Sequence, residues 1–414
     1  MTKQKTKSST APHPNSPQLR FPEFEGAWEK RKLGEVAIKI NSGKTPLGGE
    51  SVYQENGILF IRSQNVNNDT LSLDNSTFIS EEINNTMKNS IVKSNDILLN
   101  ITGASLGRSC VVPENFGLGN VNQHVCIIRL NPENNPRFLQ PILSSIKGQN
   151  TFISLQTGSG REGLNFESIK GMEISFPTLP EQTKIATFLT AVDEKIQALK
   201  KKKTLLESYK KGVMQQLFSQ KLRFRDSYLN EFEKWSTKLG GELFESISNK
   251  NHNSDLPILA ITQEHGAIPR DLIEYKISVT DKSIESYKVV DIGDFIISLR
   301  SFQGGIEYSN YKGICSPAYV ILRKVLPINN TFYKYYFKTD YYIQRLGEKL
   351  EGIRDGKMIS YKYFSEIELP YPTLPEQTRI AQFLSALDEK INQVQGQIEK
   401  TEAWKKGVVQ RMFL

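Results

Sequence analysis

Cysteine and histidine are scarce in this sequence, and their positions exclude several kinds of site. Its three cysteines, Cys110, Cys126 and Cys315, are widely spaced in apolar runs, which indicates buried, reduced thiols and no disulfide framework. Its four histidines are scattered, and none pairs with a cysteine or carboxylate at zinc-ligand spacing. We therefore expect that the chain binds no metal and works in a reducing compartment, the cytoplasm.

Long apolar runs are also missing from the sequence. No window approaches the roughly eighteen apolar residues of a membrane-spanning helix, so we expect no membrane contact. Residues 1–18 are basic and polar but lack the apolar stretch of a signal peptide. This segment is predicted to be a disordered tail.

The motifs of DNA-modifying and nucleotide-hydrolysing enzymes are absent as well. Gly43-Lys44-Thr45 lacks the upstream glycine of a phosphate-binding loop, and the glycine-rich run at 158–161 does not lead from a strand into a helix. The Asn/Asp-Pro-Pro-aromatic run of amino-methyltransferases does not occur, and the Asp-Glu-Lys triplets at 193–195 and 388–390 fit a solvated helical face better than a nuclease site. We expect a chain without catalytic activity of its own.

Length and charge set the broad class of the protein. The 414 residues exceed the usual size of one hydrophobic core and predict two domains. The formal net charge of +8 favours a polyanionic partner, because Lys and Arg release counterions from a phosphate backbone. Charge alone does not identify that partner.

An internal repeat is the most informative feature of the sequence. Residues 177–219 align without a gap onto residues 372–414 at an offset of 195, and 23 of the 43 pairs are identical. PTLPEQTKIATFLTAVDEKI recurs as PTLPEQTRIAQFLSALDEKI, and YKKGVMQQLF recurs as WKKGVVQRMF. Each copy opens with Thr-x-x-Glu, at Thr178 and Glu181 and at Thr373 and Glu376, which predicts a helix that begins with a capping box.

Both copies carry apolar residues at heptad spacing, which is typical of a coiled coil. The predicted seam residues are Ile185, Leu189, Val192, Ile196, Leu199, Leu206, Val213 and Leu217 in the first copy, and Ile380, Leu384, Leu387, Ile391, Val394, Ile398, Val408 and Met412 in the second. A helix over 180–218 would be roughly 58 Å long at about 1.5 Å per residue. Because the ends of a domain usually lie close together, we expect the second helix to run back antiparallel to the first, with pseudo-two-fold symmetry. The alternative, a separate surface helix in each half, would not require near-identical sequences.

The remainder of the chain is duplicated more faintly. LRFPEFEGAWEKRKLGE from residue 19 resembles LRFRDSYLNEFEKWSTKLGGE from residue 222. Strands are predicted at corresponding places, over 57–62 and 257–262, 96–101 and 294–299, 125–130 and 319–323, and 173–176 and 368–371. Helices are predicted over 138–151 and 332–350. The fold class is therefore α+β, with two mixed α/β domains in tandem and a long helix after each.

With these features the chain resembles the specificity subunit of type I restriction-modification systems. The resemblance rests on the two LPEQ-x-x-IA-x-FL-x-A-x-DEKI blocks, the two KKGV-x-Q ends and the preceding globular segments. It implies a first target-recognition domain over 19–177, a central conserved helix over 178–219, a second target-recognition domain over 220–372 and a C-terminal conserved helix over 373–414. Because the two domains differ in sequence, the DNA target is expected to be bipartite and asymmetric.

The resemblance also implies the partners of the chain. Double-stranded DNA would bind the two domains, and the paired helices would dock two copies of a methyltransferase subunit and, through them, the restriction subunits that carry motor and nuclease. AdoMet, ATP and Mg would be bound by those partner subunits and none of them by this chain. The chain would direct adenine methylation and ATP-dependent DNA cleavage and catalyse neither.

Loop residues of suitable chemistry are the candidates for DNA contact. Arg can bind guanine bidentately and Asn or Gln can bind adenine, while Gly permits a close backbone approach. The candidates are Arg62, Gln64, Asn65, Ser105, Arg108, Gln123 and Arg161 in the first domain, and Thr262, Gln263, Arg300, Gln303, Arg354 and Lys357 in the second. For each of them a solvated loop position or a phosphate contact is the alternative.

Two other functions are compatible with parts of the sequence. A coiled-coil scaffold without nucleic acid would explain the long helices. The recognition part of a self-sufficient nuclease-methyltransferase would explain the domains, but it needs catalytic motifs that this chain lacks.

Overall fold

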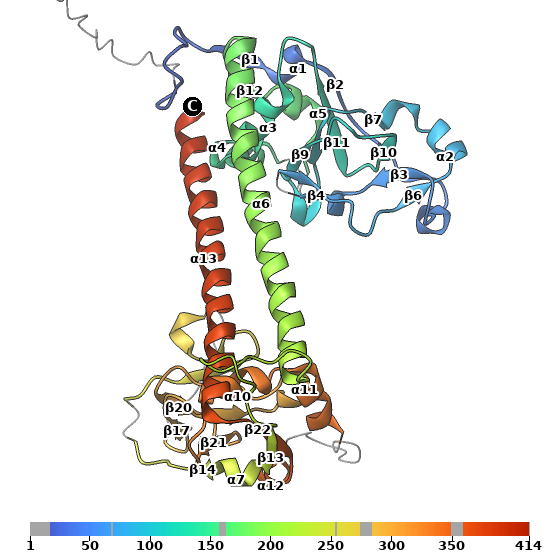
Figure 1. Ribbon diagram of the computed structural model, residues 1–414. Helices are drawn as coiled ribbons and strands as arrows, with labels where there is room; N and C mark the ends of the chain where they lie inside the picture. Colours follow the sequence, from blue (N-terminus) through green and yellow to red (C-terminus); the bar gives the residue numbers. More distant parts are fainter. Residues whose placement is uncertain are drawn as a thin grey trace, which may run out of the picture. The chain divides into compact units, whose positions relative to one another are not determined.

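The computed structural model describes residues 17–67, 69–156, 163–252, 255–273, 284–348 and 359–413. The chain divides into two compact units, Met1–Lys200 with Gly396–Leu414 and Lys201–Gln395. Two long helices, α6 (Leu179–Phe218) and α13 (Leu374–Met412), contribute to both units (Figure 1). The first unit holds the beginning of α6 and the end of α13, and the second holds the end of α6 and the beginning of α13.

The first unit is built on two four-stranded sheets, with strand orders β2-β11-β8-β9 and β6-β3-β10-β7. Its elements are β1 (Glu29–Lys32), α1 (Leu33–Val36), β2 (Ala37–Ser42), β3 (Ile58–Ile61), η2 (Ser63–Asn65), β4 (Val66–Asn67), β5 (Thr70–Leu71), β6 (Phe78–Ile79), α2 (Glu81–Asn85), β7 (Ile91–Val92), β8 (Ile97–Asn100), η4 (Gly103–Ser105), β9 (Ser109–Val111), β10 (Gly119–Val121), β11 (Val125–Leu130), α3 (Pro136–Ser144), α4 (Ile146–Leu155), α5 (Phe166–Lys170) and β12 (Glu173–Phe176).

The described residues of the second unit repeat this plan. Its elements are β13 (Ser236–Leu239), α7 (Gly240–Leu243), β14 (Phe244–Ile247), β15 (Leu259–Thr262), β16 (Gly266–Pro269), β17 (Lys288–Val290), β18 (Phe295–Ile297), α9 (Ser301–Gly304), β19 (Glu307–Tyr308), β20 (Gly313–Cys315), β21 (Val320–Lys324), α10 (Asn330–Tyr336), α11 (Asp340–Gly347), α12 (Tyr361–Ser365) and β22 (Glu368–Tyr371). The sheet β14-β21-β18-β19 corresponds to β2-β11-β8-β9.

The first and last strands of each domain are paired. In the first unit β1 pairs antiparallel with β12, and in the second β13 pairs antiparallel with β22. Each domain therefore starts and ends at one place, directly before the first turn of a long helix. Because its first and last strands are paired, each globular domain is attached to the start of its long helix at a single place.

One core in each unit joins the domain to the long helices. In the first unit Phe138 of α3 and Ile185 of α6 belong to the same buried cluster as Met412 of α13. In the second unit Phe332 of α10 and Ile380 of α13 share a cluster with Leu217 of α6. In each unit the beginning of one long helix packs with the end of the other, so the helices are antiparallel, as predicted.

The predicted seam positions are mostly covered. Of the sixteen seam residues all but Leu206 and Ile391 are buried, and those two are half-buried. Ile185 and Leu189 pack into the domain core of the first unit as well as beside α13. The ends of the seam therefore anchor a domain and do more than pair two helices.

Two sequence predictions are wrong in detail. The helices predicted over 138–151 and 332–350 are each broken, because Ser145 and Thr339 have extended backbones and cap a second helix. The hydroxyl of Ser145 accepts a hydrogen bond from the Gly148 amide at 3.1 Å. The capping box is also wrong for the second long helix, because the hydroxyl of Thr373 is buried without a hydrogen-bond partner.

Candidate DNA interface

Strand ends bring the candidate loops of the first unit together. β3 and β10 are parallel, with Val121 beside Ile61, so both strands end at the same edge of their sheet. The amide of Asn122 donates a hydrogen bond to the Ile61 carbonyl at 3.1 Å across that edge. The loop after β3, which carries Gln64, therefore lies next to the loop after β10, which carries Gln123.

Two further loops reach the same place. β11 begins directly after the Gln123 loop and pairs with the end of β8 at Asn100 and with the end of β2 at Ser42. The hydroxyl of Thr102, after β8, lies 2.6 Å from Nδ1 of His124. The hydroxyl of Thr45, after β2, donates to Oε1 of Gln123. We call residues 43–45, 62–65, 102–108 and 122–124 the first loop edge.

The candidate residues of the first loop edge differ in orientation. Arg62 donates from Nη2 to the Thr77 hydroxyl at 2.7 Å and lies over the Tyr53 ring, so its side chain holds the domain together. Asn65 is 2% exposed and bonds the Arg62 amide and the Ser72 carbonyl, which is also a structural role.

The other candidates of the first loop edge are accessible. The side chains of Gln64, Arg108 and Gln123 are exposed, and Ser105 is half-buried. The side-chain amide of Gln123 is bonded within the edge, through Oε1 to Thr45 and through Nε2 to Nε2 of His124 at 3.0 Å. Arg161 lies outside the described residues.

The second unit places its candidates around one turn and one short helix. Gln263, in the turn between β15 and β16, donates from Nε2 to the carbonyl of Arg300 at 3.3 Å. Gln263, Arg300 and Gln303 are exposed, whereas the Thr262 hydroxyl accepts the His265 amide and shapes the turn. We call the β15–β16 turn and the start of α9, with their exposed residues Gln263, Arg300 and Gln303, the second loop edge. Arg354 and Lys357 lie outside the described residues.

A buried carboxylate fixes the start of each domain to a long helix. Glu181, in the first turn of α6, accepts two hydrogen bonds from Arg20 at 2.7 Å and one from Trp28 Nε1 at 3.3 Å. Glu376, at the same position of α13, accepts from Arg223 at 3.1 and 2.9 Å and from Trp235 Nε1 at 2.9 Å. The same Arg–Glu–Trp contact therefore holds both domains.

The neighbouring glutamines repeat this duplication. Gln182 accepts the Asn135 amide and donates to the Pro177 carbonyl. Gln377 makes the same two contacts with Asn329 and Pro372. The Glu-Gln pair of each LPEQ motif is thus a docking point for its own domain. The Thr-x-x-Glu spacing predicts a capping role for the glutamate and does not reveal this contact with the domain.

Each unit also has a groove where its domain meets the two long helices. The groove of the first unit measures about 870 Å³ and that of the second about 700 Å³. Eight helix positions line both at the constant offset of 195: Asp193, Ile196, Gln197, Glu402, Lys405, Lys406, Val409 and Gln410 in the first, and Asp388, Ile391, Asn392, Glu207, Lys210, Lys211, Met214 and Gln215 in the second. The grooves are therefore equivalent on the helix side and differ on the domain side.

The ion pairs in the two grooves are also equivalent on the helix side and different on the domain side. Lys405 binds Asp193 at 2.7 Å, and Lys210 binds Asp388 in the second unit. On the domain side, Lys405 also binds Asp69 at 3.1 Å. Burial would raise the pKa of Asp69, but Lys405 and the hydrogen bond from Gln140 outweigh it and hold that pKa below its ordinary value. In the second unit the domain partner is Tyr335, whose hydroxyl donates to Asp388 at 2.7 Å.

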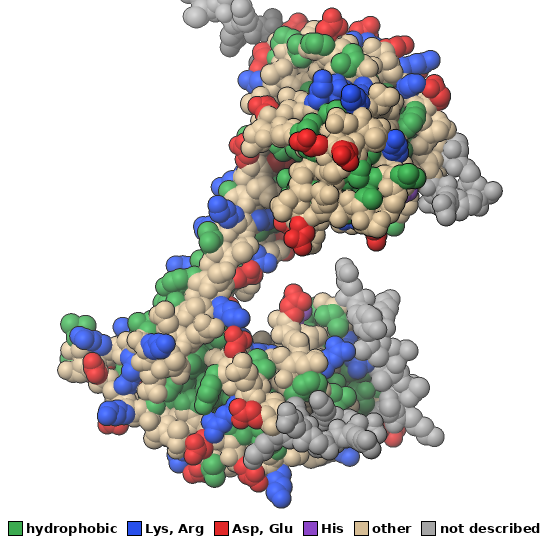
Figure 2. All heavy atoms as spheres, turned by 90° about the vertical axis from the view of Figure 1, so that its right-hand side faces the viewer, with side chains coloured by type: hydrophobic (Ala, Val, Ile, Leu, Met, Phe, Trp, Pro, Cys, Tyr) green, Lys and Arg blue, Asp and Glu red, His purple; other side chains and the backbone are tan. Residues whose placement is uncertain are grey.

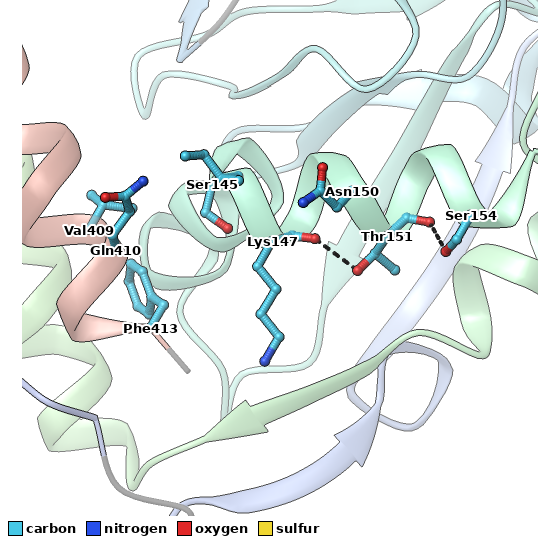
Figure 3. A pocket seen from close by; sticks show the side chains of 9 residues that line it. Ser145, Lys147, Asn150, Thr151, Ser154, Val409, Gln410 and Phe413 are labelled. Carbon is cyan, nitrogen blue, oxygen red and sulfur yellow. Dashed lines mark hydrogen bonds between the residues drawn. The ribbon is translucent and has the colours of Figure 1, made fainter.

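A third hollow of about 550 Å³ lies between α4 and the end of α13. Figure 3 shows the hydroxyls of Thr151 and Ser154 directed back to carbonyls of α4, at 2.9 and 2.8 Å. Val409 and Gln410 of α13, and Phe413 directly after it, line the hollow at its other end, beside Ser145 (Figure 3). The hydroxyls of Thr151 and Ser154 are thus already bonded to the backbone of their own helix.

Three further features of the described part of the chain are its candidate metal ligands, its helices and its surface charge. Among the described residues, no group of three or more His, Cys, Asp or Glu could hold a metal ion. None of the described helices combines the length and apolarity that a bilayer crossing requires. On the face drawn in Figure 2, Lys and Arg side chains are interspersed with Asp and Glu over both units. Because the described residues of this face show no continuous basic patch, we look for DNA recognition in individual side chains of the loop edges and not in net charge.

Comparisons with known proteins match nearly the whole chain. The family model described as type I restriction modification DNA specificity domain matches twice, over residues 25–208 and 233–403. The type I restriction enzyme MjaVIII specificity subunit of Methanocaldococcus jannaschii is 24% identical over 411 residues, which cover 94% of this chain and 92% of the relative.

Solved structures show the same fold. The S subunit of a type I restriction-modification system from M. genitalium matches with a TM-score of 0.57 at 17% identity, over 96% of this chain and 99% of that one. A chain from a study of complex assembly and conformational transition of the type I R-M system matches with a TM-score of 0.55 at 19% identity, over 93% and 96%. At these identities the likeness concerns the fold alone.

Proposed function

The chain belongs to the type I restriction modification DNA specificity family, and from that premise we propose that its two domains read the two halves of an asymmetric, bipartite DNA sequence. The carrying observation is that the two domains hold their exposed hydrogen-bonding side chains on loops of different construction. The first loop edge offers Gln64, Arg108 and Gln123 from separate loops after β3, β8 and β10, and the second offers Gln263, Arg300 and Gln303 from the β15–β16 turn and the start of α9. Similar residue types on different supports favour two different half-sites.

The chemistry of these side chains supports base reading in the major groove. A glutamine amide can donate to and accept from the adenine edge, and an arginine can donate twice to guanine. Because Arg62 and Asn65 are held by contacts inside the domain, we assign the reading to the exposed candidates. Phosphate contacts from neighbouring lysines would position the domain without adding sequence information.

We further propose that the paired helices dock two copies of a methyltransferase subunit and, through them, the restriction subunits. The near-identity of the helices supports this, because two equivalent surfaces fit two copies of one partner. AdoMet, ATP and Mg would be bound by those partners, and this chain would direct adenine methylation and DNA cleavage without catalysing either. The complex would act in the cytoplasm.

Genome-wide mapping of methylated adenine in cells with and without this chain tests the proposal. A bipartite motif that disappears with the chain is the expected result. Exchange of residues 222–370 for the corresponding part of another specificity subunit should then change one half of the motif. Change in both halves, or an unchanged methylation pattern, would overturn the proposal.

Single substitutions test the base readers. Arg108→Ala should cost about 1–3 kcal/mol of binding to the cognate site and relax one base position of the first half. Arg137→Ala, on α3 away from the loop edge, is the control and should leave the motif unchanged. Titration of the complex on cognate and mutated duplexes at fixed salt measures both effects.

A coiled-coil scaffold that acts without nucleic acid is the competing function. It predicts no binding of the assembled complex to random duplex DNA at any salt concentration. The DNA-reading function predicts binding whose affinity falls steeply as salt rises, because phosphate contacts release counterions. Methyl transfer by the purified chain alone would instead favour a self-sufficient enzyme.

A further inference from the structure

A row of hydrogen bonds links four side chains across the first loop edge. The hydroxyl of Thr45 donates to Oε1 of Gln123, and Nε2 of Gln123 lies 3.0 Å from Nε2 of His124. Nδ1 of His124 lies 2.6 Å from the hydroxyl of Thr102. Thr45 and Gln123 are exposed, whereas His124 and Thr102 are half-buried. The row therefore leads from an inner support to an amide at the surface.

The backbone of His124 is bonded on both sides. Its amide donates to Oδ1 of Asn122 at 3.0 Å, and its carbonyl accepts a hydrogen bond from the Ile101 amide at 3.0 Å. Asn122 directly follows β10 and Ile101 directly follows β8, so both contacts come from strand ends. The domain itself therefore sets the position of the imidazole.

The side-chain amide of Gln123 keeps one acceptor position and one donor beyond these contacts. A glutamine oxygen has two lone pairs and its nitrogen has two hydrogens, and the row uses one of each. The remaining pair matches the edge of adenine in the major groove, which offers the N6 donor and the N7 acceptor. Gln123 can therefore bind the row and a base at the same time.

His124 determines which end of the Gln123 amide donates. The hydroxyl of Thr45 can donate or accept, so it fits either end of the amide. An amide nitrogen can only donate, so Nε2 of His124 accepts and its ring proton lies on Nδ1, toward Thr102. An amide turned the other way would direct its N–H at the N6 donor of adenine, whereas guanine has the acceptor O6 at that place.

We propose that Gln123 reads an adenine in the first half-site and that His124 is the positioning residue that sets the direction of its amide. The inference rests on the proposed function and names one base that this function would select. In the second unit the loop before β21 has Pro317 and Ala318, whose side chains carry no hydrogen-bonding group. The effect therefore belongs to the first half-site alone.

Two charged substitutions at His124 test the direction of the amide. A glutamate carboxylate can only accept hydrogen bonds, and a lysine ammonium can only donate them. His124→Glu should keep the preference for adenine, although its negative charge weakens binding to every duplex. His124→Lys should strengthen binding to every duplex, lower the preference for adenine about fivefold to 150-fold and favour guanine. A purely electrostatic or structural role of His124 does not predict this opposition between affinity and base preference.

Competition binding measures these preferences on the complex isolated from cells that express the chain. The duplexes contain the mapped methylation motif, with each base pair placed in turn at every position of the first half. Gln123→Ala should relax one position, and the base there should be adenine. Thr102→Val removes the hydroxyl beside the imidazole and should lower the preference about twofold to tenfold, the value of one net hydrogen bond. Thr151→Val, on α4 outside the loop edge, is the matched control and should change no position.

The possible results separate this inference from the proposed function. The inference is wrong if Gln123→Ala relaxes no position or one without adenine, or if His124→Glu and His124→Lys show the same base preference at wild-type melting temperature. If either charged variant melts at a lower temperature, Thr102→Val decides, and equal preferences for it and Thr151→Val would overturn the role of His124. A wild-type chain without a bipartite motif would overturn the proposed function, and this inference with it.

Discussion

Replacement of Arg223 by methionine should strongly destabilise the second unit. The side chain of Glu376 is 0% exposed, and it accepts two hydrogen bonds from Arg223 and one from Trp235. Without Arg223 the carboxylate stays buried with the Trp235 indole as its remaining side-chain donor. Loss of one member of a buried ion pair typically costs about 3–5 kcal/mol, because the partner charge is left uncompensated.

The assay is differential scanning calorimetry of the full chain, which can resolve separate transitions of the two units. For a unit of roughly two hundred residues, about 2–4 °C is lost per kcal/mol, so the transition of the second unit should fall by about 6–20 °C. The mirror variant Arg20→Met should lower the transition of the first unit in the same way, since Arg20 pairs with Glu181, whose side chain is 2% exposed.

Two control variants test whether the buried Arg223–Glu376 pair accounts for the loss of stability. Arg225→Met removes an exposed arginine from the same segment and should change stability by less than about 0.5 kcal/mol. The double variant Arg223→Met/Glu376→Leu removes both charges and should be more stable than Arg223→Met alone. If Arg223→Met behaves like Arg225→Met, the buried pair does not hold the domain to the helix.

Three further outcomes are expected. Burial raises the pKa of the Cys110, Cys126 and Cys315 thiols to about 12, so at pH 8 a disulfide-exchange reagent should label none of them in the native chain and all three after denaturation; rapid native labelling would contradict this. Lys405→Met leaves Asp69 and Asp193 without their shared cation and should cost about 1 kcal/mol in calorimetry, a small value because both carboxylates are partly exposed; an unchanged transition would show that the bridge is unimportant. Gln263→Ala should relax one base of the second half-site in methylation maps and leave the first half unchanged; loss of specificity in both halves would argue against separate readers.

The long helices could be predicted from the sequence because local pattern determines them. The heptad spacing and the repeat place both helices within one or two residues of their observed ends. Their antiparallel pairing followed from chain connectivity. The break before α4 was missed because Ser145 interrupts an otherwise helical run, and only its extended backbone and capping hydroxyl reveal the second helix.

The candidate reading residues show what sequence cannot provide. Arg62 and Gln64 were equally good candidates by side-chain chemistry. In the structure Arg62 turns inward to Thr77, whereas Gln64 is exposed. The Arg20–Glu181 pair was missed because the residues are 161 positions apart. A signal for it was present, since Leu-Arg-Phe precedes each domain and the LPEQ motif follows each.

Under the proposed function, the division between repeated and variable contacts would let such a chain acquire a new DNA target by exchange of a domain. Each domain is fixed by a glutamate, a glutamine and an arginine that belong to the repeated segments, so a different domain can be inserted without altering those contacts. The grooves add one variable contact, because the repeated Lys405–Asp193 and Lys210–Asp388 pairs meet Asp69 in one domain and Tyr335 in the other. A carboxylate can bind the lysine of the pair and a hydroxyl can bind the aspartate, so domains of unlike sequence can satisfy the same helix residues. The helices therefore constrain the polarity of the domain surface that meets them, and leave the loop edges free to diverge.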